Sequence, residues 1–482
     1  MTSIPREPDS LPPGRMARLG GFGMVSQADS YVFRPTNVQE VKDVLALASQ
    51  AERQVTLRGA GRSYGDANIG AECLVLDLSR MNQIYSFNKL NGEMDCQAGV
   101  TIEQIWRMGL EDGFWPPVVS GTMFPTIGGA LAMNIHGKNA FKAGTLGDHI
   151  LEIDVVLPNG DVRTLKPQSE LFHAVISSAG LLGVITRAKL KLKRVKSGDL
   201  RVLPISISNL ESHFSTMQSL EGDADYMVAW LDCFARGDKL GRGLFHAAWH
   251  GEEDSASPSS FTPGHQDLPD SVLGFFPKAA MWRLLKKFNN RLGMKFVNWA
   301  KFISSRTLGN GRPHPQSLVG FSFLLDYVPH WRNAYLPGGF IQYQSFVPKE
   351  HALAVFKAQL ELQQQNKLES FLGVLKRHRT DQFLFSHGVD GYSLALDFKV
   401  TKRNRKQLVE MAHQMNEMVL EAGGRFYLAK DSTLRPEDFG RSIGPEALAT
   451  FRALKAQLDP ESILTSSLAQ RLKLDPRTHE TL

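Results

Sequence analysis

Long apolar runs and cysteine are both scarce in this chain of 482 residues. No apolar run approaches the length of a membrane span, and the polar, proline-rich stretch over residues 1–15 lacks the apolar core of a signal peptide. The three cysteines, Cys73, Cys96 and Cys233, have neither metal-ligand spacing nor the even number of a disulfide framework. We therefore expect a cytoplasmic protein in a reducing compartment, without a metal site.

Two common nucleotide-binding signatures are also absent. The glycines at 59, 61 and 65 do not fit G-x-G-x-x-G, and no Gly-Lys-Ser or Gly-Lys-Thr occurs. These absences disfavour a nicotinamide-binding Rossmann domain and an NTPase. The net charge of +6 is modest for this length and does not by itself require a nucleic-acid partner.

The chain does contain two glycine-rich stretches, over residues 58–66 and 120–139, and the first directly follows a strand-like run. Glycine permits close approach of a ligand to the backbone and positive φ, so both stretches can present successive N–H groups to a phosphate. Glycine is also the default turn residue, so either stretch alone is compatible with an ordinary turn. The two together indicate a cradle for a large phosphorylated cofactor.

The chain is longer than the roughly 250–300 residues that usually fold around a single hydrophobic core, which predicts two domains. Short strands alternate with helices up to about residue 195, and the composition changes near Ser197, where we place a domain boundary. The periodicity predicts helices over 37–53, 171–178, 349–365 and 405–422, strands over 73–78, 154–157, 188–195, 339–347, 391–400 and 425–429, and a hairpin turn at 158–161.

No Asp or Glu occurs between Asp270 and Asp326, where nine Lys and Arg residues alternate with aromatic side chains. Three accounts fit this segment. It is an amphipathic lid against an anionic membrane or a lipid-phosphate substrate, a nucleic-acid surface, or a loop with a helix packed on the second domain. The nucleic-acid account is the weakest of the three, and we expect no nucleic-acid partner.

Six stretches carry a resemblance to a known family. The chain resembles the FAD-linked oxidases of the vanillyl-alcohol oxidase type, also called the p-cresol methylhydroxylase (PCMH) type, and within them a sugar-oxidase branch. The matching stretches follow the family's order from about residue 30 to 475 and lie at 61–66, 134–139, 180–186, 340–344, 429–432 and 469–472.

The resemblance implies an α+β, two-domain, PCMH-type FAD-binding flavoprotein with a mixed-sheet substrate (cap) domain. The FAD-binding domain is expected over residues 1–196. The substrate domain is expected over 197–422, with a basic lid over 271–325, and residues 423–482 are expected to return to the FAD domain.

The resemblance also assigns cofactor-binding residues. The expected FAD contacts are Arg58, Gly59, Ala60, Gly61, Arg62, Ser63, Tyr64, Gly121, Thr122, Gly128, Gly129, Asn134, His136, Gly137, Gly183 and Ile185. In relatives with covalent flavin, a histidine precedes the serine of the first loop. Arg62 occupies that position here, so non-covalent FAD is expected.

Lys430, His136 and Tyr64 are the expected catalytic residues. A lysine whose pKa is lowered by burial can accept the proton of an alcohol or stabilise an alkoxide. From the residues alone, Lys430 is interpreted as a surface lysine at a strand end and His136 as a structural histidine in its own turn; the resemblance instead places both at the flavin. The expected substrate contacts are Lys138, Gln342, Gln344, Lys376, Ser393 and Ala395, and sugar-oxidising relatives carry a cysteine at the position of Ala395.

The resemblance thus implies an FAD-dependent oxidoreductase that oxidises a secondary hydroxyl of a sugar. The favoured substrate is a polyprenylphosphoryl ribose, which would be oxidised at C2. A separate NAD(P)H-dependent reductase would then reduce the keto product and complete an epimerisation. An aldonolactone or alditol oxidase acting on a soluble sugar is the nearest alternative. A non-catalytic nucleic-acid or membrane-binding protein, which would be colourless, represents another class. Peripheral contact with the inner face of a membrane is compatible with the first reading.

Overall fold

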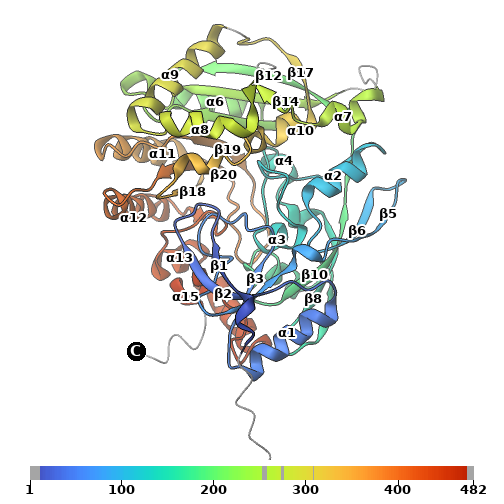
Figure 1. Ribbon diagram of the computed structural model, residues 1–482. Helices are drawn as coiled ribbons and strands as arrows, with labels where there is room; N and C mark the ends of the chain where they lie inside the picture. The colour runs from blue at the N-terminus through green and yellow to red at the C-terminus, as the bar shows by residue number, and fades with distance from the viewer. Residues whose placement is uncertain (1–10, 252–257, 273–275, 308, 475–482) are drawn as a thin grey trace, which may run out of the picture.

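The computed structural model describes residues 11–251, 258–272, 276–307 and 309–474 (Figure 1). The parts of the expected segments that fall on residues 1–10, 252–257, 273–275, 308 and 475–482 lie outside the described residues. Three main sheets carry the fold, and helices surround them. Within the described ranges, no helix combines the length and apolar character needed to cross a membrane.

A four-stranded sheet carries the first glycine loop at the end of β3. Its strand order is β1-β2-β4-β3, with β2, β4 and β3 parallel. The strands are β1 (Met16–Gly20), β2 (Gln27–Phe33), β3 (Val55–Arg58) and β4 (Leu74–Asp77). Helix α1 (Val38–Gln50) begins after Asn37, whose side chain accepts a hydrogen bond from Glu40 N, and it buries Val41, Val44, Leu45 and Ala48.

A five-stranded antiparallel sheet follows in the order β5-β6-β10-β8-β9. Its strands are β5 (Ile84–Phe87), β6 (Glu93–Gln97), β8 (Ile150–Val156), β9 (Val162–Leu165) and β10 (Val184–Lys191). The predicted hairpin turn joins β8 to β9, and Gly160 supplies its positive φ of 85°. A short pair, β7 (Phe114–Trp115) and β11 (Lys193–Arg194), lies beside this sheet.

An antiparallel sheet of eight strands forms the remaining layer, in the order β17-β12-β14-β13-β19-β20-β18-β21. Its strands are β12 (Asp199–Ile207), β13 (Tyr226–Leu231), β14 (Gly243–His250), β17 (His314–Ser317), β18 (Phe340–Pro348), β19 (Gly373–His378), β20 (Gly391–Lys399) and β21 (Arg425–Phe426). A two-residue hairpin of β15 (Ser271–Val272) and β16 (Phe276–Pro277) precedes the helices of the basic segment.

Helices connect and cover these sheets. The further α-helices are α2 (Ile102–Leu110), α3 (Ile127–Ala132), α4 (Ala140–Ala143), α5 (Glu170–Val175), α6 (Leu210–Leu220), α7 (Pro263–Gln266), α8 (Lys278–Phe288), α9 (Arg291–Thr307), α10 (Leu318–Ser322), α11 (Lys349–Gln365), α12 (Arg405–Glu421), α13 (Pro436–Ile443), α14 (Pro445–Leu458) and α15 (Ser467–Arg471). The 3-10 turns are η1 (Pro13–Arg15), η2 (Leu78–Arg80), η3 (Leu146–His149), η4 (Gly237–Lys239), η6 (Pro258–Phe261), η7 (Leu324–Tyr327) and η8 (Trp331–Tyr335). Figure 1 shows α8 and α9 at the end of the molecule opposite α1.

The periodicity predicted most of the long elements. The helix over 349–365 is α11, and the predictions for α12, β18 and β20 agree with the structure to within about two residues. The strand predicted over 425–429 is wrong beyond Phe426, because the chain then turns with Lys430 N donating to Tyr427 O (2.9 Å). The basic segment folds into α8 and α9, and α9 packs against β12 and β14.

The C-terminal segment returns to the first sheet, where the red helices lie beside the blue strands in Figure 1. Leu464 forms a parallel bridge with Val55. The Arg471 guanidinium then donates to both carboxylate oxygens of Asp66 (2.8 Å each) and to Asp431 (2.8 Å). Arg471 therefore ties the end of the first glycine loop to the turn that carries Lys430.

We predict that Arg471→Met lowers the free energy of unfolding by about 3–5 kcal/mol, because it leaves the carboxylates of Asp66 and Asp431 buried without their cation. Arg441→Met is the matched control, since the side chains of Arg441 and its partner Glu417 are 49% and 41% exposed and such pairs contribute less than about 1 kcal/mol. Urea denaturation followed by circular dichroism measures both. Equal losses in the two variants would contradict the role given to Arg471.

Candidate active site

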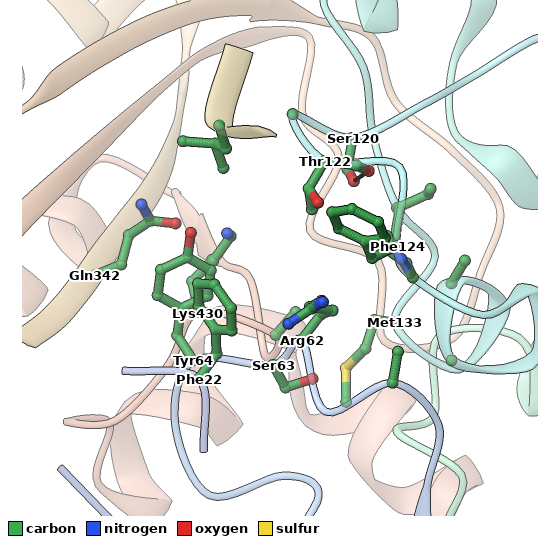
Figure 2. A pocket seen from close by; sticks show the side chains of 18 of the residues that line it. Phe22, Arg62, Ser63, Tyr64, Ser120, Thr122, Phe124, Met133, Gln342 and Lys430 are labelled. Carbon is green, nitrogen blue, oxygen red and sulfur yellow. Dashed lines mark hydrogen bonds between the residues drawn. The ribbon is translucent and has the colours of Figure 1, made fainter. Parts of the chain in front are cut away.

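A cavity of about 920 Å³ is lined by residues from all three main sheets. Its volume lies at the upper end of the range of roughly 300–1,000 Å³ found for small-molecule sites, so it has room for a large ligand. Figure 2 shows Tyr64, Gln342 and Lys430 on one side of it and Ser120, Thr122 and Phe124 on the other. The cavity is therefore where the cofactor and the substrate expected from the sequence would meet.

The first glycine loop lines the cavity with backbone. A Cβ on Gly59 would lie 2.1 Å from Thr126 Oγ1, and Gly61 has a φ of +63°, so both positions favour glycine. Among the described residues, the backbone N–H groups of residues 60–63 form no hydrogen bond. These free donors, on a loop that approaches the second glycine stretch closely, suit a phosphate ligand.

Arginine side chains surround this loop. The Arg62 guanidinium stacks on the rings of Phe22 (5.3 Å) and Phe124 (5.2 Å), and its Nε is buried without a hydrogen-bond partner within the described ranges. Arg332 also lines the cavity and stacks on Phe22 (4.9 Å). The Arg58 guanidinium donates to Asn68 Oδ1 (3.1 Å) and to Gly20 O, which braces the loop from behind. The cavity is consequently electropositive at this end.

The second glycine stretch forms the facing wall. Gly121, Thr122, Gly128 and Gly129 line the cavity, and a Cβ on Gly128 would lie 2.8 Å from the Ala98 Cβ. Gly183 and Ile185, from the start of β10, also line it.

Asn134 and Gly137 were expected at the cofactor, but neither lines the cavity. Asn134 adopts a φ of 45°, and its Oδ1 accepts a hydrogen bond from Gly147 N (2.9 Å). Gly137 packs closely against Asn139. Both residues shape the turn that presents His136, so they support the site from behind.

Lys430 lies in the cavity wall with its Nζ 3.6 Å from the centre of the Tyr64 ring. Burial lowers the pKa of Lys430 to about 7; Asp397 opposes the shift, and Lys376 adds to it. Burial likewise raises the pKa of Asp397 to about 6, while the Gln342 amide donates to its Oδ1. Lys430 is therefore a neutral amine in a useful fraction of molecules near pH 7, as a general base requires.

Tyr64 and His136 stay neutral because both are buried. Burial raises the pKa of Tyr64 well above its usual value and lowers the pKa of His136 well below its own. The Gln344 amide nitrogen approaches His136 Nε2 (3.1 Å), which as acceptor leaves the ring proton on Nδ1. The Tyr64 hydroxyl and His136 Nδ1 have no hydrogen-bond partner within the described chain. Both are thus donors free for a ligand.

The expected substrate residues line the same cavity. Gln342 and Gln344 share one face of β18, and Ala395 lies opposite Gln344 in the ladder with β20. Ser393 Oγ lies 2.8 Å from His378 Nε2 and 3.3 Å from the Gln344 amide, which fixes the orientation of that amide. Burial lowers the pKa of Lys376 to about 8.

Lys138 differs from the expectation in one respect. It lines the cavity, but its ammonium donates to the backbone carbonyls of Phe321 and Ser322 at the end of α10. Burial lowers the pKa of Lys138 well below its usual value. We conclude that its first role is to hold α10 against the turn of His136, and that a ligand phosphate would have to compete with two carbonyls.

Sequence reasoning missed Asp326, His246 and Lys301, all of which line the cavity. Asp326 accepts hydrogen bonds from Thr122 Oγ1 (2.7 Å) and Met123 N (2.8 Å), and so fastens η7 to the second glycine stretch. Burial raises the pKa of Asp326 to about 6. Its position at the end of the acid-free segment was the one signal that could have drawn attention to it.

The residues present fit FAD. The loop of residues 59–63 offers free N–H groups at a point where a Cβ would block close approach, and Arg62 and Arg332 supply positive charge for a pyrophosphate. The apolar side chains of Ala98, Met133 and Ile135 line the cavity near the unpartnered donors of Tyr64 and His136. Such a surface suits a flat ring with polar edges.

Comparison with known proteins agrees with this fit. A protein family described as "FAD binding domain" matches residues 30–166. The decaprenylphosphoryl-beta-D-ribose oxidase of Mycolicibacterium smegmatis is 31% identical over 471 residues, which cover 96% of this chain and 98% of that protein.

Part of this chain also matches oxidoreductases that are named for other substrates. The D-lactate dehydrogenase of Archaeoglobus fulgidus is 31% identical over 188 residues, or 37% of this chain and 42% of that protein. The mitochondrial D-2-hydroxyglutarate dehydrogenase of Danio rerio is 26% identical over 225 residues, or 45% of this chain and 42% of that protein. In both of these relatives, the similarity covers less than half of this chain.

We predict that Gly59→Ala lowers the flavin content of the purified protein at least about tenfold, because the added Cβ would overlap Thr126 Oγ1 and displace the loop. Gly222→Ala is the control, since no atom lies within 4 Å of its added Cβ. The ratio of absorbance at 450 nm to that at 280 nm measures flavin content. Full flavin retention in a folded Gly59→Ala protein would contradict the placement of the cofactor at this loop.

Proposed function

Because this chain belongs to the family of FAD-linked oxidases that contains decaprenylphosphoryl-β-D-ribose oxidase, we propose that it oxidises C2 of a ribose linked to a polyprenyl phosphate. The chain is an FAD-dependent oxidoreductase, and FAD is its cofactor. The observation that carries the choice of an alcohol substrate is Lys430, a lysine of lowered pKa that shares one cavity with the glycine loops. Relatives with covalent flavin have a histidine at the position of Arg62, and an arginine cannot form that bond to the flavin. Arg62, which lines the cavity, therefore supports non-covalent binding of FAD.

Oxidation of an alcohol removes a hydride from carbon and a proton from oxygen, and bound FAD supplies the hydride acceptor. In our proposal the neutral Nζ of Lys430 takes the hydroxyl proton. Lowering of its pKa by burial makes this transfer feasible near pH 7, and the nearby Asp397 carboxylate stabilises the ammonium that results. Tyr64 contributes its ring face to the same ammonium, at 3.6 Å.

Amides and neutral donors would hold the sugar. Gln342 and Gln344 present two side-chain amides from one strand face, and the Tyr64 hydroxyl and His136 Nδ1 are buried donors without partners in the described part of the chain. Sugar hydroxyls both donate and accept hydrogen bonds, so they would satisfy these groups where an apolar substrate would leave them unpaired. This arrangement also suits an aldonolactone or alditol, which remains the second candidate.

The polyprenyl phosphate distinguishes the two candidates. A relative that covers 96% of the chain is named for a decaprenylphosphoryl ribose, and basic residues outnumber acidic ones in the described lining of the cavity. The keto product would pass to a separate NAD(P)H-dependent reductase, so that the pair of enzymes inverts C2.

We also propose a two-domain arrangement, with the FAD domain over 1–196, the substrate domain over 197–422 and a returning segment over 423–482. The four- and five-stranded sheets lie wholly within the first range, and the eight-stranded sheet starts at Asp199. The bridge between Leu464 and Val55 supports the return of the last segment, although its first strand, β21, still pairs with β18 of the eight-stranded sheet.

We propose further that α8 and α9 rest on an anionic membrane at the inner face, where a lipid-linked substrate resides. Leu292, Phe296, Trp299 and Ile303 recur at helical spacing along α9, and all four are exposed. The exposed apolar residues of α8 extend this surface, and exposed cations flank it, namely Arg283, Lys286, Lys287, Lys295 and Arg306. An apolar stripe with basic flanks is typical of helices that lie in a membrane interface.

The base role of Lys430 predicts a pH profile. The rate of flavin reduction should rise with pH through about 7, since the amine must lose its proton before it can accept another. Lys430→Met should retain FAD and slow reduction about 10²- to 10⁴-fold, without the rise near pH 7. Stopped-flow absorbance without oxygen measures both, and an unchanged pH profile in Lys430→Met would contradict this role.

The substrate assignment predicts a preference. Farnesylphosphoryl ribose, a short-chain substrate, should bleach the flavin band in the absence of oxygen, whereas alditols and aldonolactones should not. Bleaching by the soluble sugars alone would move the assignment to the second candidate. A protein that contains no flavin, even after incubation with FAD, would contradict both enzymatic assignments.

The membrane proposal predicts vesicle binding. The double variant Phe296→Asp/Trp299→Asp should lose at least about tenfold of the binding to vesicles of phosphatidylglycerol, because two apolar side chains no longer enter the bilayer. Leu90→Asp changes another exposed apolar residue, far from α9 in the sequence and 92% exposed, and should bind as the unaltered protein does. Co-sedimentation measures this, and equal binding by all three proteins would exclude α9 as the contact.

A further inference from the structure

The cavity extends past Lys430 to a compartment beneath α9. Its walls are Val228 and Trp230 of β13, His246 of β14, Val374 of β19, and Leu372, which directly precedes β19. These strands are neighbours in the eight-stranded sheet, and residues two apart along a strand share a face. The compartment is therefore continuous with the face that carries Lys376, next to the catalytic cluster.

Helix α9 closes this compartment and places one cation in it. Phe302 packs with Trp230 and Leu244, which fixes the helix on the sheet. The preceding residue, Lys301, lines the cavity, and its Nζ lies 4.2 Å from the centre of a Trp230 ring. Lys301 is an exposed residue, and part of its exposed surface forms a wall of the cavity.

No acidic side chain of the described residues forms an ion pair with Lys301. Burial lowers its pKa to about 8, and no carboxylate counters that shift, yet the amine remains largely protonated at pH 7. Lys301 keeps a large exposed surface, part of which faces the cavity, so its ammonium is only partly removed from water. An anionic ligand at this point would form a charge-assisted hydrogen bond with an ammonium that has no anion beside it.

The charges around the whole cavity lead to the same conclusion. Asp326 is the one acidic residue in the described lining, against seven basic residues, namely Arg58, Arg62, Lys138, Lys301, Arg332, Lys376 and Lys430. The three arginines lie with the first glycine loop or beside it, where the FAD pyrophosphate is expected, and Lys138 is engaged by two backbone carbonyls. Lys430 has the Asp397 carboxylate nearby, and Lys376 lies beside Lys430. Lys301 is the remaining basic residue, and it lies in the compartment beneath α9.

We propose that Lys301 and the neighbouring His246 form an anion subsite that binds the phosphate between the sugar and the lipid of the substrate, an assignment that rests on the proposed function. Val228, Leu372 and Val374 then contact the first isoprenoid carbons, and the ring of Trp230 separates the phosphate from the sheet. His246 is neutral, because burial and the nearby Lys138 and Lys301 lower its pKa to about 4, and a neutral imidazole has one N–H to donate to a phosphate. Helix α9 thereby carries a lipid-facing stripe on one side and a phosphate-binding lysine on the other.

Lys301→Met tests the subsite through charge discrimination. The substrates are farnesylphosphoryl ribose and an uncharged farnesyl riboside in which an ether replaces the phosphate. Lys301→Met should raise KM for the phosphorylated substrate about 10- to 100-fold, which is the usual contribution of a charge-assisted hydrogen bond. Its kcat, and its KM for the uncharged riboside, should stay unchanged.

Two further variants complete the comparison. Lys301→Arg keeps the positive charge and should restore most of the affinity for the phosphorylated substrate. Lys402→Met removes an exposed lysine that follows β20 and should leave both substrates unaffected. If Lys301→Met weakens both substrates equally, or neither, the anion subsite is overturned.

A binding measurement separates this inference from the proposed function. Calorimetric titration of the FAD-loaded protein compares farnesyl phosphate with farnesol, neither of which carries a sugar to oxidise. Tighter binding of farnesyl phosphate, lost in Lys301→Met, supports the subsite even if ribose is not the sugar. Equal affinity of the two lipids for the unaltered protein overturns the subsite even if ribose oxidation is confirmed.

Discussion

The active site depends on one contact between two distant parts of the chain. The first glycine loop and the turn of Lys430 meet so closely that a Cβ on Gly65 would lie 1.9 Å from Asp431 O, and Tyr64 N donates to Ala429 O (2.8 Å). Arg471 spans the contact with hydrogen bonds to Asp66 and Asp431. The cofactor loop and the proposed base are consequently fixed relative to each other before any ligand binds. Preorganisation of this kind is what makes a buried general base effective.

The second constraint is electrostatic. The protein places four lysines along one cavity, and burial lowers the pKa of every one of them. Three of these lysines have clearly different environments: Lys430 has the Asp397 carboxylate nearby, Lys138 has two carbonyls, and Lys301 has the face of Trp230. In our proposal these environments separate a proton acceptor from a structural lysine and from a ligand-binding lysine within a single cavity.

Local sequence patterns predicted much of the framework. Helix α11 and the hairpin between β8 and β9 follow from periodicity and from the turn residues around Gly160. Lys430, Gln342 and Gln344 were assigned to the cavity through motifs shared with a family, and they do line it. Asn134 and Gly137 belong to one of the same motifs but lie behind the cavity. A shared motif shows that a residue type is required at a position, but it does not show whether that residue contacts the ligand or supports the backbone.

The residues that were missed share one physical reason. Lys301, His246 and Asp326 reach the cavity only because α9, β14 and η7 pack beside strands that are distant in the sequence, and no local pattern marks such an approach. The acid-free segment drew attention to α8 and α9 as a surface. It did not reveal that Lys301, which is also exposed, lines the cavity while Phe296 and Trp299 do not, since that depends on which face of α9 packs against Trp230.

The most direct test of the account is a kinetic isotope effect on flavin reduction, measured without oxygen with farnesylphosphoryl ribose that carries deuterium at C2. The account predicts that the flavin band bleaches several-fold more slowly than with the unlabelled substrate, because the C2–H bond breaks in that step. Bleaching at the same rate with both substrates, or an isotope effect from another ring position instead, would contradict oxidation at C2.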